Sequence, residues 1–144
     1  MKKLRKLLFL LLAGLAVCGV TSCGGESESI SEPALEPAVT VTEYVSITAE
    51  EAKARMDNET DYIIIDARTE EEFAEGHIEG AILIPEYEIA DRAADELPDK
   101  EQLILVYCRS GRRSKIASQA LAELGYTNVR EFGGIIDWPY DIVK

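Results

Sequence analysis

From about residue 44 onward, apolar residues follow two kinds of pattern, continuous short runs and helical spacing. Short runs in which every residue is apolar occupy residues 62–65, 81–84 and 103–107. Such continuous runs are typical of strands that are buried on both faces of a sheet. A weaker run at residues 129–132 predicts a final strand before Gly133 and Gly134.

Two helices are indicated by the residues at their N-termini. Thr48 with Glu51, and Thr69 with Glu72, each have the spacing of a capping box. In this motif the threonine side chain and the glutamate three residues later bond each other's backbone N–H groups. The boxes predict one helix from Thr48 to about residue 57 and a second, shorter one from Thr69 to Gly76.

Helical spacing of apolar residues predicts the remaining helices. These cover residues 88–97 and 114–124, the latter ended by Gly125, and a last helical turn lies around residues 135–138. Apolar strands that alternate with helices predict an α/β fold. Its central, mostly parallel sheet would have about four to five short strands flanked by helices on both faces. In such folds the ligand site lies beyond the carboxyl ends of the strands.

A cysteine stands at one of these strand ends. The loop after the run at 103–107 reads Cys108-Arg109-Ser110-Gly111-Arg112-Arg113-Ser114. Backbone N–H groups at the start of the next helix, the helix dipole and three arginines would favour a thiolate. We therefore predict that Cys108 is a nucleophile and not an inert buried thiol. Gly111 would supply the turn, and Ser114 would either donate a hydrogen bond to the sulfur or cap the helix.

The stretch that precedes the periodic region resembles a bacterial lipoprotein signal. Residues 1–22 combine a basic start, an apolar run and small residues before Cys23. The apolar run is shorter than the roughly 20 residues of a spanning helix. We expect removal of 1–22 and a lipid on Cys23, which would anchor the protein to the membrane outside the cytoplasm. The alternatives are an uncleaved anchor or a secreted protein. Residues 23–43, rich in Gly, Ser, Glu and Pro, predict a flexible acidic linker, and 44–144 form the domain.

Charge and cysteine content narrow the range of partners. The formal net charge is −12, and removal of residues 1–22, which carry four basic and no acidic residues, would make it −16. This acidity argues against nucleic acid as a partner, whereas the basic loop would concentrate small anions. With Cys18 removed and Cys23 lipidated, Cys108 would be the one thiol left, so no intrachain disulfide is expected. One histidine and one usable cysteine, far apart in sequence, predict no metal site.

Several motifs occur here in the order that the rhodanese (sulfurtransferase) family shows. They are Ile65-Asp66-Ala67-Arg68, Glu72-Phe73 with Gly76-His77-Ile78-Glu79-Gly80-Ala81, Ile84-Pro85, the Cys108 to Arg113 loop, and Gly125-Tyr126 with Gly133-Gly134 and Trp138. Residues 44–144 thus resemble a single rhodanese domain. The fold that this resemblance implies agrees with the α/β pattern.

The resemblance also implies a reaction. A Cys108 thiolate would take the outer sulfur of a small anionic donor such as thiosulfate, and the resulting persulfide would pass it to cyanide or a thiol. This covalent intermediate requires no separate cofactor. Backbone N–H groups from Arg109 through Arg113 would hold the persulfide, and Arg112 or Arg113 would bind the oxyanion of the donor.

Residues outside the loop are given supporting roles. Asp66 and Arg68 are interpreted as an ion pair that fixes the wall of the loop, with substrate contact as the alternative. His77 belongs to a structural turn of the family, and a thiolate of lowered pKa needs no general base. Trp138 and Tyr140 are expected to pack near the rim of the pocket or under the last helical turn.

Two other functions remain open at this point. One is a non-enzymatic persulfide carrier or binding module that a protein partner loads and unloads. The other is a cysteine-dependent phosphatase or an arsenate reductase. Related phosphatases place an arginine six residues after the cysteine, but Ser114 holds that position here and Arg113 comes one residue earlier. The shorter loop favours sulfur over phosphate.

Overall fold

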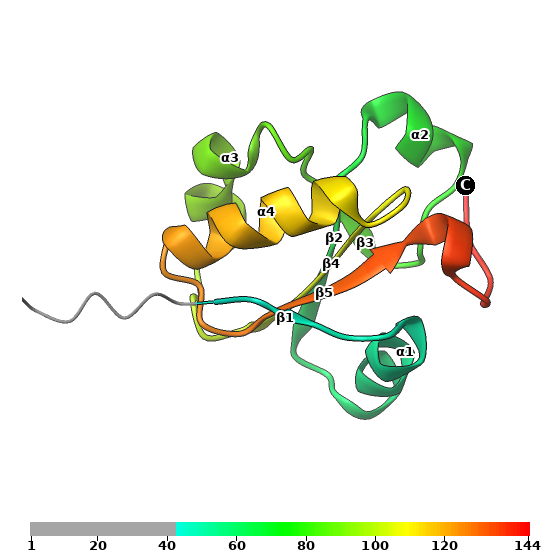
Figure 1. Ribbon diagram of the computed structural model, residues 1–144, viewed down its shortest axis with the longest axis horizontal. Helices are drawn as coiled ribbons and strands as arrows, with labels where there is room; N and C mark the ends of the chain where they lie inside the picture. Colours follow the sequence, from blue (N-terminus) through cyan, green and yellow to red (C-terminus); the bar gives the residue numbers. More distant parts are fainter. Residues whose placement is uncertain (1–42) are drawn as a thin grey trace, which may run out of the picture. The chain divides into compact units, whose positions relative to one another are not determined.

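The computed structural model describes residues 43–144 (Figure 1). Five parallel strands form one sheet in the order β1-β5-β4-β2-β3. The strands are β1 (Val45–Ser46), β2 (Tyr62–Asp66), β3 (Ala81–Leu83), β4 (Leu103–Cys108) and β5 (Val129–Gly134). The helices are α1 (Ala49–Asn58), α2 (Glu70–Glu75), α3 (Ile89–Glu96), α4 (Arg112–Glu123) and the 3₁₀ turn η1 (Ile135–Asp137). The predicted α/β fold with a parallel sheet is confirmed.

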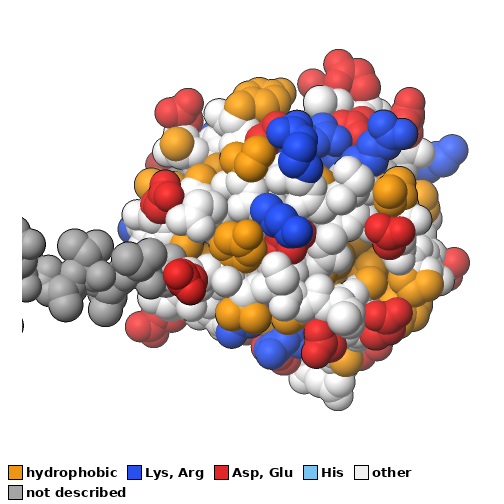
Figure 2. All heavy atoms as spheres, in the orientation of Figure 1, with side chains coloured by type: hydrophobic (Ala, Val, Ile, Leu, Met, Phe, Trp, Pro, Cys, Tyr) orange, Lys and Arg blue, Asp and Glu red, His pale blue; other side chains and the backbone are white. Residues whose placement is uncertain are grey.

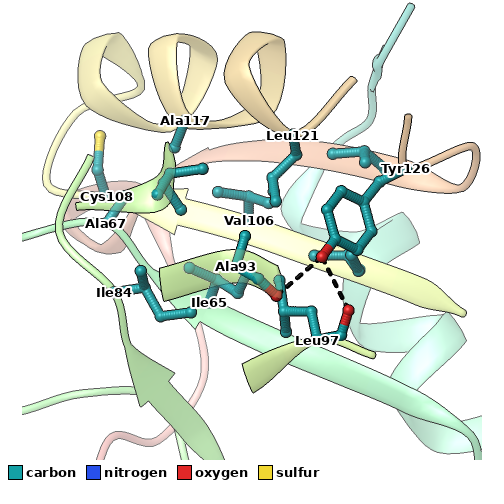
Figure 3. Packing of buried hydrophobic residues seen from close by; sticks show 13 residues of the cluster. Ile65, Ala67, Ile84, Ala93, Leu97, Val106, Cys108, Ala117, Leu121 and Tyr126 are labelled. Atoms are coloured by element: carbon teal, nitrogen blue, oxygen red, sulfur yellow. Dashed lines mark hydrogen bonds between the residues drawn. The ribbon is translucent and has the colours of Figure 1, made fainter. Parts of the chain in front are cut away.

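Two cores lie on the two faces of the sheet. Successive residues of β4 point to opposite faces, so Val106 and Cys108 join the core beneath α3 and α4, while Leu105 and Tyr107 join the core beneath α1. Every residue of β4 is buried, as expected for the central strand of a covered parallel sheet. Figure 3 shows Cys108 at one end of the first core, near the start of α4.

Both predicted capping boxes are present. The Thr48 side chain accepts from the N–H of Glu51 at 3.1 Å, and the Thr48 N–H donates to the Glu51 carboxylate at 2.8 Å. Thr69 and Glu72 repeat the arrangement at 3.4 and 3.3 Å. Local side-chain chemistry therefore determines where α1 and α2 begin.

Some predicted boundaries were wrong. Helix α4 begins at Arg112 and not near Ser114, because Gly111 takes a left-handed conformation (φ 93°) and serves as N-cap. Strand β3 ends one residue early at Leu83, and β5 runs on to Gly134. The edge strand β1 was not predicted, because two exposed residues carry no apolar pattern.

The N-terminal predictions fall outside the described part of the chain. This applies to the signal peptide at 1–22, to Cys23 and to all but the last residue of the linker at 23–43. Across residues 43–144, no helix combines the length and the apolar composition needed to cross a membrane.

Candidate functional site

Cys108 is the last residue of β4 and stands at the carboxyl edge of the sheet. Its side chain is 1% exposed and lies at the start of α4 (Figure 3). The left-handed Gly111 turns the loop back over the sulfur, and its N–H donates to Cys108 Sγ at 3.1 Å. A residue with a Cβ atom would adopt this backbone at a cost of about 1–2 kcal/mol. Gly111 thus brings the beginning of α4 onto the sulfur.

This cradle favours the anionic form of the sulfur. Burial by itself raises the pKa of Cys108, but the polar Ser114 hydroxyl and the backbone N–H groups of Ser114, Ser110 and Gly111 lower it below the ordinary cysteine value. No side chain caps α4, so the N–H groups of its first turn are free to act on the sulfur. The positive end of the helix dipole adds to the same effect.

The three arginines of the loop differ in their surroundings. Arg113 forms a two-pronged ion pair with Glu72 of α2, with Nη1–Oε2 at 2.6 Å and Nη2–Oε1 at 2.8 Å. The hydrogen bond to Arg113 lowers the pKa of Glu72 to about 2. Arg109 and Arg112 are exposed and form no ion pair with any other residue in the described range. The Glu72 partner of Arg113 was not predicted from the sequence.

A shallow cavity opens beside the loop. Its volume is about 440 Å³, and Arg109, Ile135 and Ile136 line it together with Arg68 and Glu72. Ile136 is 63% exposed, so an apolar surface lies next to the cationic side chain of Arg109. In Figure 2, Lys and Arg side chains gather over the region where Figure 1 shows the start of α4 and α2.

The predicted ion pair between Asp66 and Arg68 is confirmed. Arg68 Nε and Nη2 donate to the Asp66 carboxylate at 2.9 and 2.7 Å, and Nη2 also donates to the carbonyl of Gly76 at 2.7 Å. Both side chains are buried. The Tyr107 hydroxyl accepts from the N–H of Ile78 at 3.1 Å beside them. This network joins the end of β2 to the end of α2 and braces the wall of the site.

Ser114 does not cap α4, so that alternative was wrong. Its hydroxyl is 2.7 Å from Glu131 Oε1 and 3.1 Å from the carbonyl of Gly111. Glu131 is 2% exposed and also accepts from the N–H of Gly133 at 2.8 Å. Sequence analysis missed Glu131, although an acidic residue within a short predicted strand was a visible signal. The structure places this carboxylate behind the cradle.

His77 and Trp138 have structural surroundings. His77 Nδ1 donates to the carbonyl of Phe73 at 3.0 Å, and the two rings stack with centroids 3.7 Å apart. The backbone of His77 pairs with that of Val143. Trp138 packs against Phe132 at 5.6 Å between centroids. In the part of the chain from 43 to 144, no group of three or more His, Cys, Asp or Glu is arranged to hold a metal ion.

Comparisons with known proteins agree with this geometry. The Rhodanese-like domain family matches residues 48–139. The chain is 44% identical over 80 residues to "Thiosulfate sulfurtransferase PspE" of Escherichia coli strain K12, which covers 56% of this chain and 77% of that protein. It is 38% identical over 93 residues to a "Sulfurtransferase" of Allochromatium vinosum, covering 64% and 85%.

A solved structure matches as well. "Rhodanese with anions from E. coli" is 41% identical, with a TM-score of 0.55 over 58% of this chain and 98% of that chain. The family match therefore covers the Cys108 loop, strands β2 to β5 and the helices around them. We conclude that this chain belongs to the rhodanese-like domain family.

Proposed function

We propose that this protein is a sulfurtransferase that carries sulfane sulfur as a persulfide on Cys108. The observation that carries the proposal is the donation from the Gly111 N–H to Cys108 Sγ at 3.1 Å, at a helix start with no side-chain cap. Free backbone donors stabilise an anion whether it is the thiolate or the terminal sulfur of a persulfide. The names of the relatives support the same reaction class.

The proposed reaction has two half-reactions. The Cys108 thiolate attacks the outer sulfur of thiosulfate, a sulfur–sulfur bond forms, and sulfite leaves with the electron pair of the broken bond. The persulfide keeps one negative charge in the cradle. Cyanide or a thiolate acceptor then attacks the outer sulfur and releases the Cys108 thiolate. No other cofactor enters the balance.

Arg109 and Arg112 are the proposed binding groups for the anionic donor. Arg113 is engaged by Glu72, which offsets most of its charge. The Arg109 and Arg112 side chains are exposed, Arg109 lines the cavity beside the loop, and guanidinium groups can pair with the sulfonate group of the donor. Replacement of Arg109 by Ala should therefore raise the KM for thiosulfate more than it lowers kcat.

Intact mass spectrometry of the full-length chain tests the proposal. Thiosulfate should add one sulfur atom to the protein, and cyanide should then remove it and yield thiocyanate. The Cys108→Ala chain should gain no sulfur, and sulfur transfer by that variant would exclude Cys108 as the nucleophile. Addition of sulfur with slow release would support a persulfide carrier that exchanges with a protein partner. No addition, with hydrolysis of a phosphate ester, would support the phosphatase alternative.

We also propose that a lipid on Cys23 holds the domain at the membrane, outside the cytoplasm. The proposal rests on the signal-like pattern of residues 1–22 and on the acidic stretch at 23–43. Cells grown with radiolabelled palmitate should label the protein, and Cys23→Ala should abolish the label. A mature protein that stays in the soluble fraction would contradict the anchor.

A further inference from the structure

A buried carboxylate lies behind the sulfur cradle and takes no part in the sulfur transfer proposed above. Glu131 Oε1 accepts from the Ser114 hydroxyl at 2.7 Å and from the Gly133 N–H at 2.8 Å. Its Oε2 accepts from the Ser46 hydroxyl at 3.0 Å. Two hydroxyl groups and one backbone N–H converge on the two carboxylate oxygens, so both oxygens have hydrogen-bond partners. The side chain is 2% exposed.

Within residues 43–144, no cationic side chain forms an ion pair with this carboxylate, although buried charges are usually paired. The start of α4 lies next to the carboxylate, since a Cβ atom added to Gly111 would be 3.9 Å from Glu131 Oε1. Cys108 Sγ uses the same helix start. Two acidic groups therefore share one helix N-terminus, and ionisation of each opposes ionisation of the other.

Ser114 connects the two groups. Its hydroxyl carries one proton, which can be donated to one acceptor at a time. The hydroxyl contributes to the lowered pKa of the Cys108 thiol, yet its short contact of 2.7 Å is with Glu131 Oε1, and the carbonyls of Gly111 and Gly133 lie 3.1 and 3.3 Å from it. As long as Glu131 is ionised, it competes with the thiolate for this proton.

We propose that Glu131 is a positioning residue that limits the ionisation of Cys108, by engaging the Ser114 hydroxyl and by placing a negative charge behind the cradle. This inference rests on the proposed role of Cys108 as a nucleophile and adds a control on that role. A thiolate that is less strongly stabilised is the better nucleophile, because nucleophilicity falls as the pKa falls. Glu131 thus lowers the fraction of Cys108 that is ionised and raises the intrinsic nucleophilicity of each thiolate that forms.

Other charged groups around the cradle remain in place when Glu131 is changed. Arg113 of α4 is held by Glu72 of α2, and Glu86 after β3 also acts on Arg113. Asp66 and Arg68 pair with each other after β2. On the opposite side, the neighbouring Arg130 is influenced by the charges of Arg55 in α1 and of Glu59, which follows α1. A change in the titration of Cys108 on substitution of Glu131 is therefore assigned to Glu131 and Ser114.

Ultraviolet absorbance of the thiolate against pH tests the proposal on the full-length chain. Subtracting the spectrum of the Cys108→Ala chain leaves the signal of Cys108. Glu131→Gln keeps a carbonyl oxygen for Ser114 and Gly133 and removes the charge. The substitution should move the midpoint of Cys108 ionisation to lower pH. At a pH well below the midpoints of the variant and of the unchanged chain, the thiolate fraction should rise tenfold for each pH unit by which the midpoint falls. Ser114→Ala should move the midpoint the opposite way.

The opposite signs separate this proposal from a purely structural role. If Glu131 only kept the cradle in shape, both substitutions would loosen it and both midpoints would rise. Glu123→Gln, at the far end of α4, removes the same formal charge from an exposed position and should leave the midpoint unchanged. A midpoint for Glu131→Gln that rises, or that equals the Glu123→Gln value, would overturn the proposal.

A second measurement needs no substitution of Glu131. In the otherwise unchanged chain, the carboxyl ¹³C resonance of Glu131 should shift through the pH range in which Cys108 titrates, and this step should be missing from Cys108→Ala. An identical titration curve in both chains would contradict the coupling. Neither measurement uses a sulfur donor, so a failure of the proposed sulfur transfer and a failure of this inference are read separately.

Discussion

The N-termini of α2 and α4 differ in what bonds their first backbone N–H groups, which have no partner within the helix. Both helices follow a parallel strand and begin at the carboxyl edge of the sheet. At α2, Thr69 and Glu72 bond the free N–H groups in a capping box. At α4, Gly111 offers no side chain, and the N–H groups act on the sulfur of Cys108 instead. Of these two helix starts, the one without a side-chain cap holds the candidate nucleophile.

The capped helix also supports the uncapped one. Glu72 accepts from the N–H of Thr69 within the capping box and pairs with Arg113 of α4. One carboxylate therefore stabilises the start of α2 and ties it to the first turn of α4. The two helix ends act as a unit in which α2 supplies rigidity and α4 supplies the donors.

The largest effect on sulfur uptake is expected when Gly111, at the start of α4, is replaced by alanine. In Gly111→Ala the left-handed backbone becomes strained by about 1–2 kcal/mol, which tends to turn the N–H away from the sulfur. Loss of a hydrogen bond to a charged group should reduce sulfur uptake at neutral pH about 10–100-fold. Stopped-flow sulfite release would measure this.

Gly80→Ala is the matched control for that substitution. Gly80 has a similar positive φ of 81°, and among the described residues only Gly80 itself and its chain neighbours have atoms within 4 Å of an added Cβ. Its variant should lose comparable stability and keep the rate of sulfur uptake. Equal loss of activity in the two variants would mean that strain alone accounts for the effect.

A smaller effect, on the stability of the fold, is expected when the ion pair between Glu72 and Arg113 is removed. The pKa of Glu72 is lowered to about 2, so its ionised form stabilises the fold above its unfolded pKa of about 4.3, and this contribution is lost as pH falls toward 2. Glu72→Gln should cost about 1–2 kcal/mol at neutral pH. Urea unfolding at several pH values would show the difference from the unchanged chain shrinking between about pH 4.3 and 2.

Glu70→Gln provides the comparison for this charge effect. Glu70 is exposed in the same first turn of α2 and forms no ion pair with another described residue. Its variant should lose a few tenths of a kcal/mol from the helix dipole. A Glu72→Gln stability difference that stays constant from neutral pH to pH 2 would disprove the role of the carboxylate charge.

The smallest effect is expected at a capped end far from the sulfur. Thr48→Ala removes the cap of α1 and should cost about 1 kcal/mol of stability without altering sulfur uptake. Thr69→Ala should cost a similar amount but also slow uptake, because Glu72 would lose part of its support. Unfolding and uptake measured on both variants would decide whether only the α2 cap is coupled to the site.

The sequence predicted most of the fold because its strongest signals are local. Continuous apolar runs located β2, β3 and β4, and capping boxes located α1 and α2. These signals depend on neighbouring residues, which a single sequence displays. The two-residue β1 was missed because its pairing with β5 is set by tertiary contact and not by an apolar pattern.

The candidate site was predicted in part for the same reason. Cys108 and its loop are contiguous, so their placement at a strand end could be read directly. Glu72 and Glu131 lie 41 and 17 residues from their partners Arg113 and Ser114. Contacts at such separations depend on the sheet order, which places β5 beside β4, and on the packing of the start of α2 against the first turn of α4, and no residue pattern indicated them.

A pH titration of the Cys108 thiolate in the full-length chain decides whether an uncapped helix start, through Gly111 and its neighbours, holds the sulfur as an anion. We expect a midpoint below the ordinary cysteine value, and a higher midpoint in Gly111→Ala than in Gly80→Ala. A midpoint at or above the ordinary value in the unchanged chain would contradict this role of the helix start, because burial would then outweigh the cradle.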